Sequence, residues 1–119
     1  MKTLRKFGFF SSRGGDRSLR EAVRPIQSVT DPSEDKILAY LEAGHPYLMD
    51  AGIARDLIDS QHPVIGVPNV MTDGEWAWTQ DVMYYIRKYH IRVPSEFIAH
   101  MEGNRWMVPK VNDFKQFTL

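Results

Sequence analysis

The sequence predicts a small α+β domain in which three or four helices pack on a small antiparallel sheet with a Trp-bearing hairpin. Two observations support this class. Apolar residues recur at helical spacing in several segments, and an Asp-Gly pair separates two runs of strand-forming residues. The length of 119 residues fits one domain, so residues 1–119 are expected to form a single unit. The composition of 43% apolar and 25% charged residues is typical of a globular chain.

The first 30 residues carry the weakest structural signals. Residues 11–16, with two serines and two glycines, have the composition of a turn or flexible loop. A short helix is expected from residue 18 to residue 24, where Pro25 stops it. Residues 1–30 are therefore expected to be a loop-rich N-terminal segment.

The clearest helix signals follow directly. Asp31 is an expected N-cap, Pro32 takes the first helical position, Glu34 the third, and Gly44 ends the helix. The apolar residues of this helix fall on one face: Ile37, Leu38 and Leu41.

Strand signals occupy the middle of the chain. Residues 46–49 are expected to form a short strand, and residues 53–58 either a helical turn or a strand. Residues 64–71 are rich in β-branched side chains, but Gly66 and Pro68 favour an edge strand or a bulge over a central position.

The strongest local signal is the pair Asp73-Gly74, which suits a two-residue type I′ turn. Because side chains alternate along a strand, both indoles of the following Trp-Ala-Trp run lie on one face. The expected turn places three pairs of residues opposite each other: Thr72 with Glu75, Met71 with Trp76, and Asn69 with Trp78.

Two more helices and a last strand complete the expected fold. Thr79 caps a helix that extends to the break at residues 91–94. Pro94 or Ser95 then opens a helix that Gly103 ends, and residues 106–108 are expected to form the last strand.

Cysteine content and hydropathy bear on the compartment. The absence of cysteine excludes disulfides and thiolate metal sites. The apolar run 7–10 is shorter than a signal-peptide core, and no stretch approaches the roughly 20 apolar residues of a membrane span. A cytoplasmic location without membrane contact is therefore expected.

Charge is distributed unevenly, although the net charge is zero. Residues 1–25 hold seven basic and two acidic residues, residues 26–86 two and ten, and residues 87–119 six and three. The acidic middle block predicts either an acidic face for a basic partner or, if folding mixes the blocks, an ordinary solvated surface.

Candidates for catalysis are few. The spacing of the four histidines matches no helical metal-binding pair, and no nucleophile elbow or phosphate-binding loop is present. His90 is explained by a predicted helix C-terminus, which favours a cationic imidazole. Two carboxylate pairs suit general acid–base chemistry, although the turn alone accounts for one of their members: Asp73 with Glu75, and Asp56 with Asp59.

The tryptophans and the turn beside them are expected to have different roles. Two buried indoles each remove about 150–250 Å² from water, so Trp76 and Trp78 are better core residues than contacts. Asp73 and Glu75 are expected near solvent at the tip of a rigid strand pair, where they suit recognition.

Residues 65–101 carry a series of short motifs: Ile65-Gly66, Thr72-Asp73-Gly74-Glu75-Trp76-Ala77-Trp78, Tyr84-Tyr85, Tyr89-His90 and Pro94-Ser95-Glu96-Phe97. This pattern resembles a family of small bacterial proteins, some of which are similar to immunity proteins of contact-dependent growth inhibition or related polymorphic toxin systems. The match covers about a third of the chain.

The resemblance implies a cytoplasmic inhibitor, not an enzyme, that binds one cognate toxin domain and blocks its active site without any cofactor or metal. The toxin is expected to be a nuclease, such as a ribonuclease, whose basic cleft suits an acidic stretch of this chain. The residues expected to bind the toxin, chosen for charge and exposure, are Asp50, Asp56, Asp59, Asp73 and Glu75.

The alternative is a nucleic-acid-binding regulator that uses the basic N-terminal segment. Its arginines and lysines lie close to Phe7, Phe9 and Phe10, which would combine phosphate neutralisation with base stacking. The neutral chain as a whole makes nucleic acid the less favoured partner.

Overall fold

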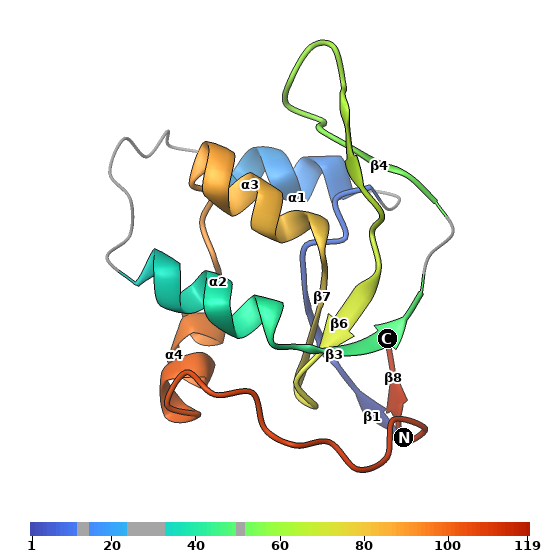
Figure 1. The fold of residues 1–119 in the computed structure, drawn as a ribbon, viewed down its shortest axis with the longest axis vertical. Coiled ribbons are helices and arrows are strands. Elements are labelled where there is room, and N and C mark those ends of the chain that lie inside the picture. Colours follow the sequence, from blue (N-terminus) through green and yellow to red (C-terminus); the bar gives the residue numbers. More distant parts are fainter. Residues whose placement is uncertain (12–14, 24–32, 50–51) are drawn as a thin grey trace.

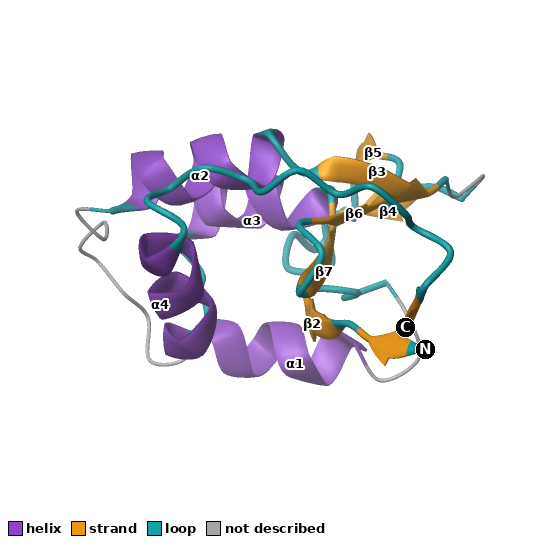
Figure 2. Ribbon diagram, turned by 90° about the horizontal axis from the view of Figure 1, so that it is seen from below, coloured by secondary structure: helices purple, strands orange, loops and turns teal. Residues whose placement is uncertain are grey.

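The computed structural model describes residues 1–11, 15–23, 33–49 and 52–119. This part of the chain forms four helices and eight short strands, which confirms the α+β class. The helices gather on one side of the molecule and the strands on the other (Figure 2). The two ends of the chain lie together, because β1 (Lys2–Thr3) pairs in parallel with β8 (Phe117–Thr118) (Figure 1).

The main sheet has the strand order β2-β7-β6-β3 and is mixed rather than antiparallel throughout. Its strands are β2 (Arg5–Phe7), β7 (Trp76–Thr79), β6 (Val70–Thr72) and β3 (His45–Leu48). The pair β2–β7 is parallel, so the N-terminal segment supplies a sheet strand where a loop-rich stretch was expected. Gly8, at φ +99, comes directly after β2 and packs against α3 (Asp81–Tyr89). A Cβ at this position would lie 2.4 Å from Cγ1 of Val82.

Strands β6 and β7 are antiparallel, but the expected register is wrong. Met71 lies opposite Trp78 and Thr72 opposite Ala77. The Asp73 N–H donates to the Trp76 carbonyl at 3.2 Å, so the turn consists of the two residues that follow Asp73. The first of them is the glycine at φ +97, a conformation that glycine adopts without strain.

The run 64–71 forms two strands rather than one. Strand β5 (Val64–Gly66) pairs with β4 (Ala54–Arg55), and β6 lies in the interior of the main sheet. The expected edge position is therefore wrong for β6, because Pro68 falls between the two strands and removes no bond from either ladder.

The four helices are α1 (Gly15–Ala22), α2 (Glu34–Glu42), α3 (Asp81–Tyr89) and α4 (Ser95–Gly103). The prediction for α4 is confirmed, whereas α1 begins earlier than residue 18. The expected cap of α2 at Asp31 and Pro32 lies outside the described residues. Thr79 does not cap α3: it ends β7, and its hydroxyl accepts the Phe9 N–H at 3.0 Å.

The strand expected at residues 106–108 is not formed. Arg105 and Trp106 both have positive φ, 56° and 61°, so the chain reverses after α4 instead of extending. The Trp106 N–H donates to the Met101 carbonyl, which satisfies one of the last carbonyls of the helix.

The core confirms that both tryptophans are buried. Trp76 stacks on Phe97 of α4 at 4.4 Å between ring centroids, and Trp78 contacts the same ring at 5.6 Å. Ala77, which faces the other side of β7, belongs to a second cluster with Leu4 and Phe117. None of the helices in the described parts of the chain combines the length and the apolar character needed to cross a membrane.

Candidate functional site

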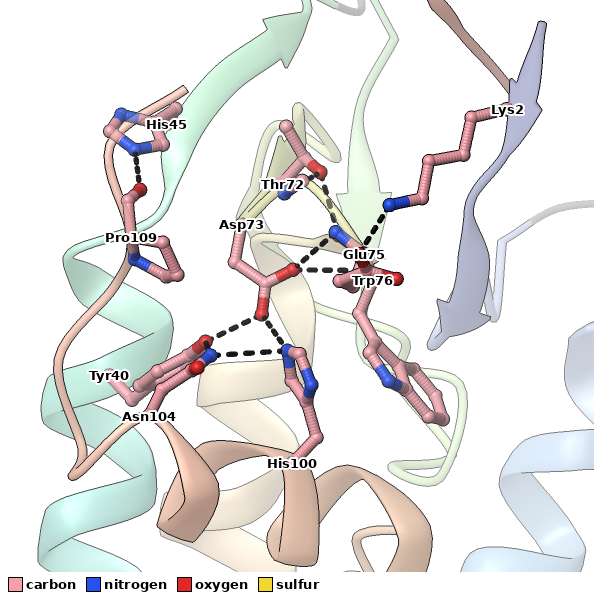
Figure 3. A network of polar contacts seen from close by, with 11 residues as sticks. Lys2, Tyr40, His45, Thr72, Asp73, Glu75, Trp76, His100, Asn104 and Pro109 are labelled. Atoms are coloured by element: carbon pink, nitrogen blue, oxygen red, sulfur yellow. Dashed lines mark hydrogen bonds and ion pairs between the residues drawn. The ribbon is translucent and has the colours of Figure 1, made fainter. Parts of the chain in front are cut away.

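Asp73 is a buried junction between the β6–β7 turn and two helices (Figure 3). One carboxylate oxygen accepts the backbone N–H groups of Glu75 and Trp76, at 2.9 and 2.8 Å. The other accepts the Tyr40 hydroxyl of α2 at 2.5 Å and lies 2.8 Å from Nε2 of His100 on α4. The expectation that Asp73 is exposed for recognition is therefore wrong: its side chain is fully enclosed and its oxygens are occupied.

Tyr40 and Asn104 complete this junction. The Asn104 amide donates to the Tyr40 hydroxyl at 3.1 Å, while that hydroxyl donates to Asp73. Burial, together with the hydrogen bond to the carboxylate, raises the pKa of Tyr40 above its ordinary value. The tyrosine stays protonated and acts as a fixed donor.

Glu75 is exposed, as expected, but its charge is compensated by the N-terminal strands. Its carboxylate forms an ion pair with Lys2 of β1, also drawn in Figure 3. Arg5 of β2 pairs with Glu96, and its guanidinium lies 4.5 Å from the centre of the Trp76 ring. The turn is thus bordered by cations, and no isolated acidic tip is formed.

Asp56 is a second buried carboxylate and anchors the segment between β4 and β5. One oxygen accepts the N–H groups of Ile58 and Asp59, at 2.8 and 2.9 Å. The other accepts the hydroxyls of Tyr84 and Tyr89 of α3, at 2.7 and 2.6 Å. The side chain is completely buried, so the expected exposure of Asp56 is also wrong.

The protonation of Asp56 follows from two opposed effects. Burial acts to raise the pKa of the carboxyl, but the hydrogen bonds from Tyr89, Asp59, Tyr84 and Ile58 together outweigh burial and lower the pKa to about 2. The Lys88 ammonium lies 3.6 Å from the same carboxylate. Asp56 is therefore an anion at neutral pH, with every interaction directed inward.

Helical spacing explains why one face of α3 holds this segment. Tyr85 stands between the two other tyrosines and adds two bonds: its hydroxyl donates to the Arg55 carbonyl at 3.0 Å and accepts the Leu57 N–H at 3.0 Å. Burial raises the pKa of Tyr85 to about 12. Residues 55–59 are thus fixed to α3 by side-chain bonds although they form almost no regular structure.

Two of the residues expected to bind the toxin remain, Asp50 and Asp59. Asp50 lies outside the described residues. Asp59 is partly exposed and lies 3.9 Å from Lys88. Of the four described residues, Asp56 and Asp59 lie together at Lys88, whereas Asp73 and Glu75 lie at the β6–β7 turn, so the four do not form one acidic face.

The acidic middle block loses further charge from the surface. Of the eight carboxylates of this block that the structure describes, three are buried, namely Asp56, Asp73 and Asp81. Burial raises the pKa of Asp81, which opens α3. Glu42 pairs with Arg87, and Glu34 lies 3.0 Å from Nδ1 of His90, so the C-terminal basic block offsets part of the charge of the acidic block.

The alternative based on the N-terminal segment loses its stacking platform. Phe7 and Phe10 are core residues, with exposures of 6% and 2%. Phe10 packs edge-on against Tyr85. These rings are not available to nucleic-acid bases.

The feature that sequence reasoning missed is an exposed apolar surface. Six of the eight large apolar side chains that are exposed among the described residues fall in one stretch, called here the 48–67 surface: Leu48, Met49, Ile53, Ile58, Val64 and Val67. The loop that joins β4 to β5 is the uppermost part of the molecule in Figure 1, beyond α3. A sequence signal existed, because apolar residues in 53–67 fit neither helical nor strand period well.

No group of three histidine or acidic side chains in the described residues is arranged to hold a metal ion. No protein-family model, curated protein or solved structure matches this chain.

Proposed function

We propose that this protein is an immunity protein that binds and neutralises a cognate toxin domain by covering it, without catalysing a reaction. The observation that carries the proposal is the 48–67 surface. Single apolar residues on a surface are ordinary, but the concentration of six of the eight exposed ones within residues 48–67 favours a protein-binding site in this part of the chain. That the toxin is a nuclease is the implication of the sequence resemblance and belongs to the same proposal.

The contact chemistry differs from the acidic face that the sequence suggested. Ile53 and Val64 have exposures of 61% and 56%, so they offer apolar area that only a partner can remove from water. Arg55 and Asp59 lie in the same stretch and suit the polar rim of such an interface.

Rigidity also supports a binding role. Because Asp56 and Tyr85 hold residues 55–59 to α3, the 48–67 surface carries an irregular segment whose conformation is already fixed. A pre-organised segment loses less conformational entropy when it binds, which raises affinity without new contacts.

The test begins with the reading frame directly upstream of this gene: if it encodes a large secreted protein with a variable C-terminal domain, that domain is the candidate toxin. Co-expression of the two is expected to rescue growth, and the purified proteins are expected to co-elute in gel filtration. Substitutions I53S and V64S should weaken binding at least about tenfold each, as measured by calorimetry.

The matched control is M107S, since Met107 is 71% exposed but lies outside the 48–67 surface. It should leave affinity unchanged. Absence of both growth rescue and a complex would refute the immunity function. Equal losses for M107S and I53S would refute the assignment to this surface.

A further inference from the structure

A groove of about 470 Å³ lies between β5 and α3, beside the 48–67 surface. The β5 side contributes Ile65, Gly66 and Val67, and α3 contributes Met83 and Tyr84 among others. Val67 belongs to both features, being 43% exposed and lining the groove. The volume is within the roughly 300–1,000 Å³ that binding sites typically enclose, which suffices for a few residues of an extended chain.

Two cations line the groove, and both already lie near carboxylates: Arg87 near Glu42, and Lys88 near Asp56 and Asp59. Arg87 and Lys88 both line it, with side chains 53% and 45% exposed. The acidic residue among the lining, Asp81, has both carboxylate oxygens buried. Arg87 lies 3.4 Å from Glu42 at the surface, and exposed pairs of this kind are weak enough to exchange for another carboxylate.

The apolar residues and the two cations that line the groove favour some classes of ligand over others. A nucleic-acid backbone would meet the cations but would leave Ile65, Val67 and Met83 against charged phosphates. A peptide segment that alternates acidic and apolar side chains satisfies both kinds of lining. The open wall at Gly66, where a Cβ would meet no atom within 4 Å, admits a close approach of backbone.

We propose that the β5–α3 groove is the docking site for an acidic, apolar segment of the partner protein, which inserts an apolar side chain between Val67 and Met83 and places a carboxylate at Arg87. This inference deepens the proposed function, on which the identification of the partner as the toxin domain rests. Lys88 also adjoins the Asp56 network, so Arg87 is the cation whose role is separable from folding.

The first experiment needs no identified partner. The ¹⁵N-labelled full chain is titrated with a pentapeptide alternating glutamate and leucine, with one alternating lysine and leucine, and with a single-stranded DNA oligonucleotide. The acidic peptide should shift the amide signals of residues 65–67 and 80–88 in a saturable way, and the other two probes should leave them unchanged.

Variants locate the binding within the groove. V67D and R87E should each weaken acidic-peptide binding at least about tenfold. M107D is the matched control, because Met107 is 71% exposed, lies outside the 48–67 surface and does not line the groove. Thermal unfolding of each variant checks that the fold is intact, which exposed positions should preserve.

Several outcomes would overturn the inference. They are unshifted groove signals with the acidic peptide, shifts caused by the oligonucleotide, or equal losses for M107D and V67D. Toxin binding separates the two proposals. A complex that tolerates V67D and R87E removes the groove and keeps the immunity function, whereas peptide binding without any toxin complex keeps the groove and removes the immunity function.

Discussion

Asp73 and Asp56 are two buried carboxylates that accept nearly the same set of hydrogen bonds in two different parts of the molecule. Each has one oxygen that accepts two backbone N–H groups from residues just after it in the chain and another that accepts a tyrosine hydroxyl. Asp73 joins the sheet to α2 and α4 beside the stacked Trp76 ring. Asp56 joins a projecting segment to α3 alone.

The same kind of polar junction therefore has two structural roles in this protein. Around Asp73 the bonds close the interior, so the motif that suggested recognition is structural. Around Asp56 they fix residues 55–59 to α3, so under the proposed function a buried residue shapes the segment that is offered to the partner. Removing each carboxylate should therefore have different consequences.

The largest effect is expected for D73A. It leaves two backbone N–H groups and the Tyr40 hydroxyl buried without their acceptor, which costs about 3–5 kcal/mol of unfolding free energy. The melting temperature should fall by about 10–20 °C in a thermal scan. The control E75Q, at an exposed neighbour, should cost less than about 1 kcal/mol. Equal losses for both variants would contradict an interior role for Asp73.

A smaller and more local effect is expected for D56A, about 2–3 kcal/mol. Hydrogen exchange should accelerate around residues 55–59, where the N–H groups of Ile58 and Asp59 lose their acceptor, and change little in β6 and β7. Exchange that rises equally in the main sheet would show that Asp56 supports the whole fold and would remove the contrast with Asp73.

The pH dependence of stability sharpens the role of Asp56. Its pKa of about 2 in the folded protein lies below the roughly 3.9 of an unfolded aspartate, so the folded state favours the anion. This stabilisation is complete above about pH 4 and is lost as the pH falls through 2, a change of about 2 kcal/mol. The gap in unfolding free energy between wild type and D56N should shrink by that amount from pH 5 to pH 2. Urea unfolding measures it, and a constant gap would contradict the lowered pKa.

The smallest effects compare the two tyrosine donors. Y40F should cost about 1.5 kcal/mol, because it removes both the hydrogen bond to the buried Asp73 and the hydrogen bond from the partly buried Asn104 amide. Y89F should cost about 0.5–1 kcal/mol, since Tyr84 still donates to Asp56. Denaturant unfolding of both variants measures the two losses of unfolding free energy. A larger loss for Y89F than for Y40F would contradict the greater contribution of the Asp73 junction to stability.

Helices and the two buried indoles were predictable because their signals are short-range. Apolar spacing over one or two turns defines α3 and α4, and alternation along three residues puts Trp76 and Trp78 on one face. The turn after Thr72 was also predictable from the sequence, but the register of the two strands that it joins was not. Asp73 accepts N–H bonds with its side chain, and this moves the turn forward by one residue.

Sequence by itself determined the fold class, most helices and the burial of the two indoles, since these depend on neighbours a few positions apart. Only the tertiary structure decided which aspartates are buried, because their donors come from far along the chain: Tyr40 is 33 residues from Asp73, and Tyr89 is 33 residues from Asp56. The same long-range contacts placed β2 beside β7 and left the apolar side chains of the 48–67 surface without a cover.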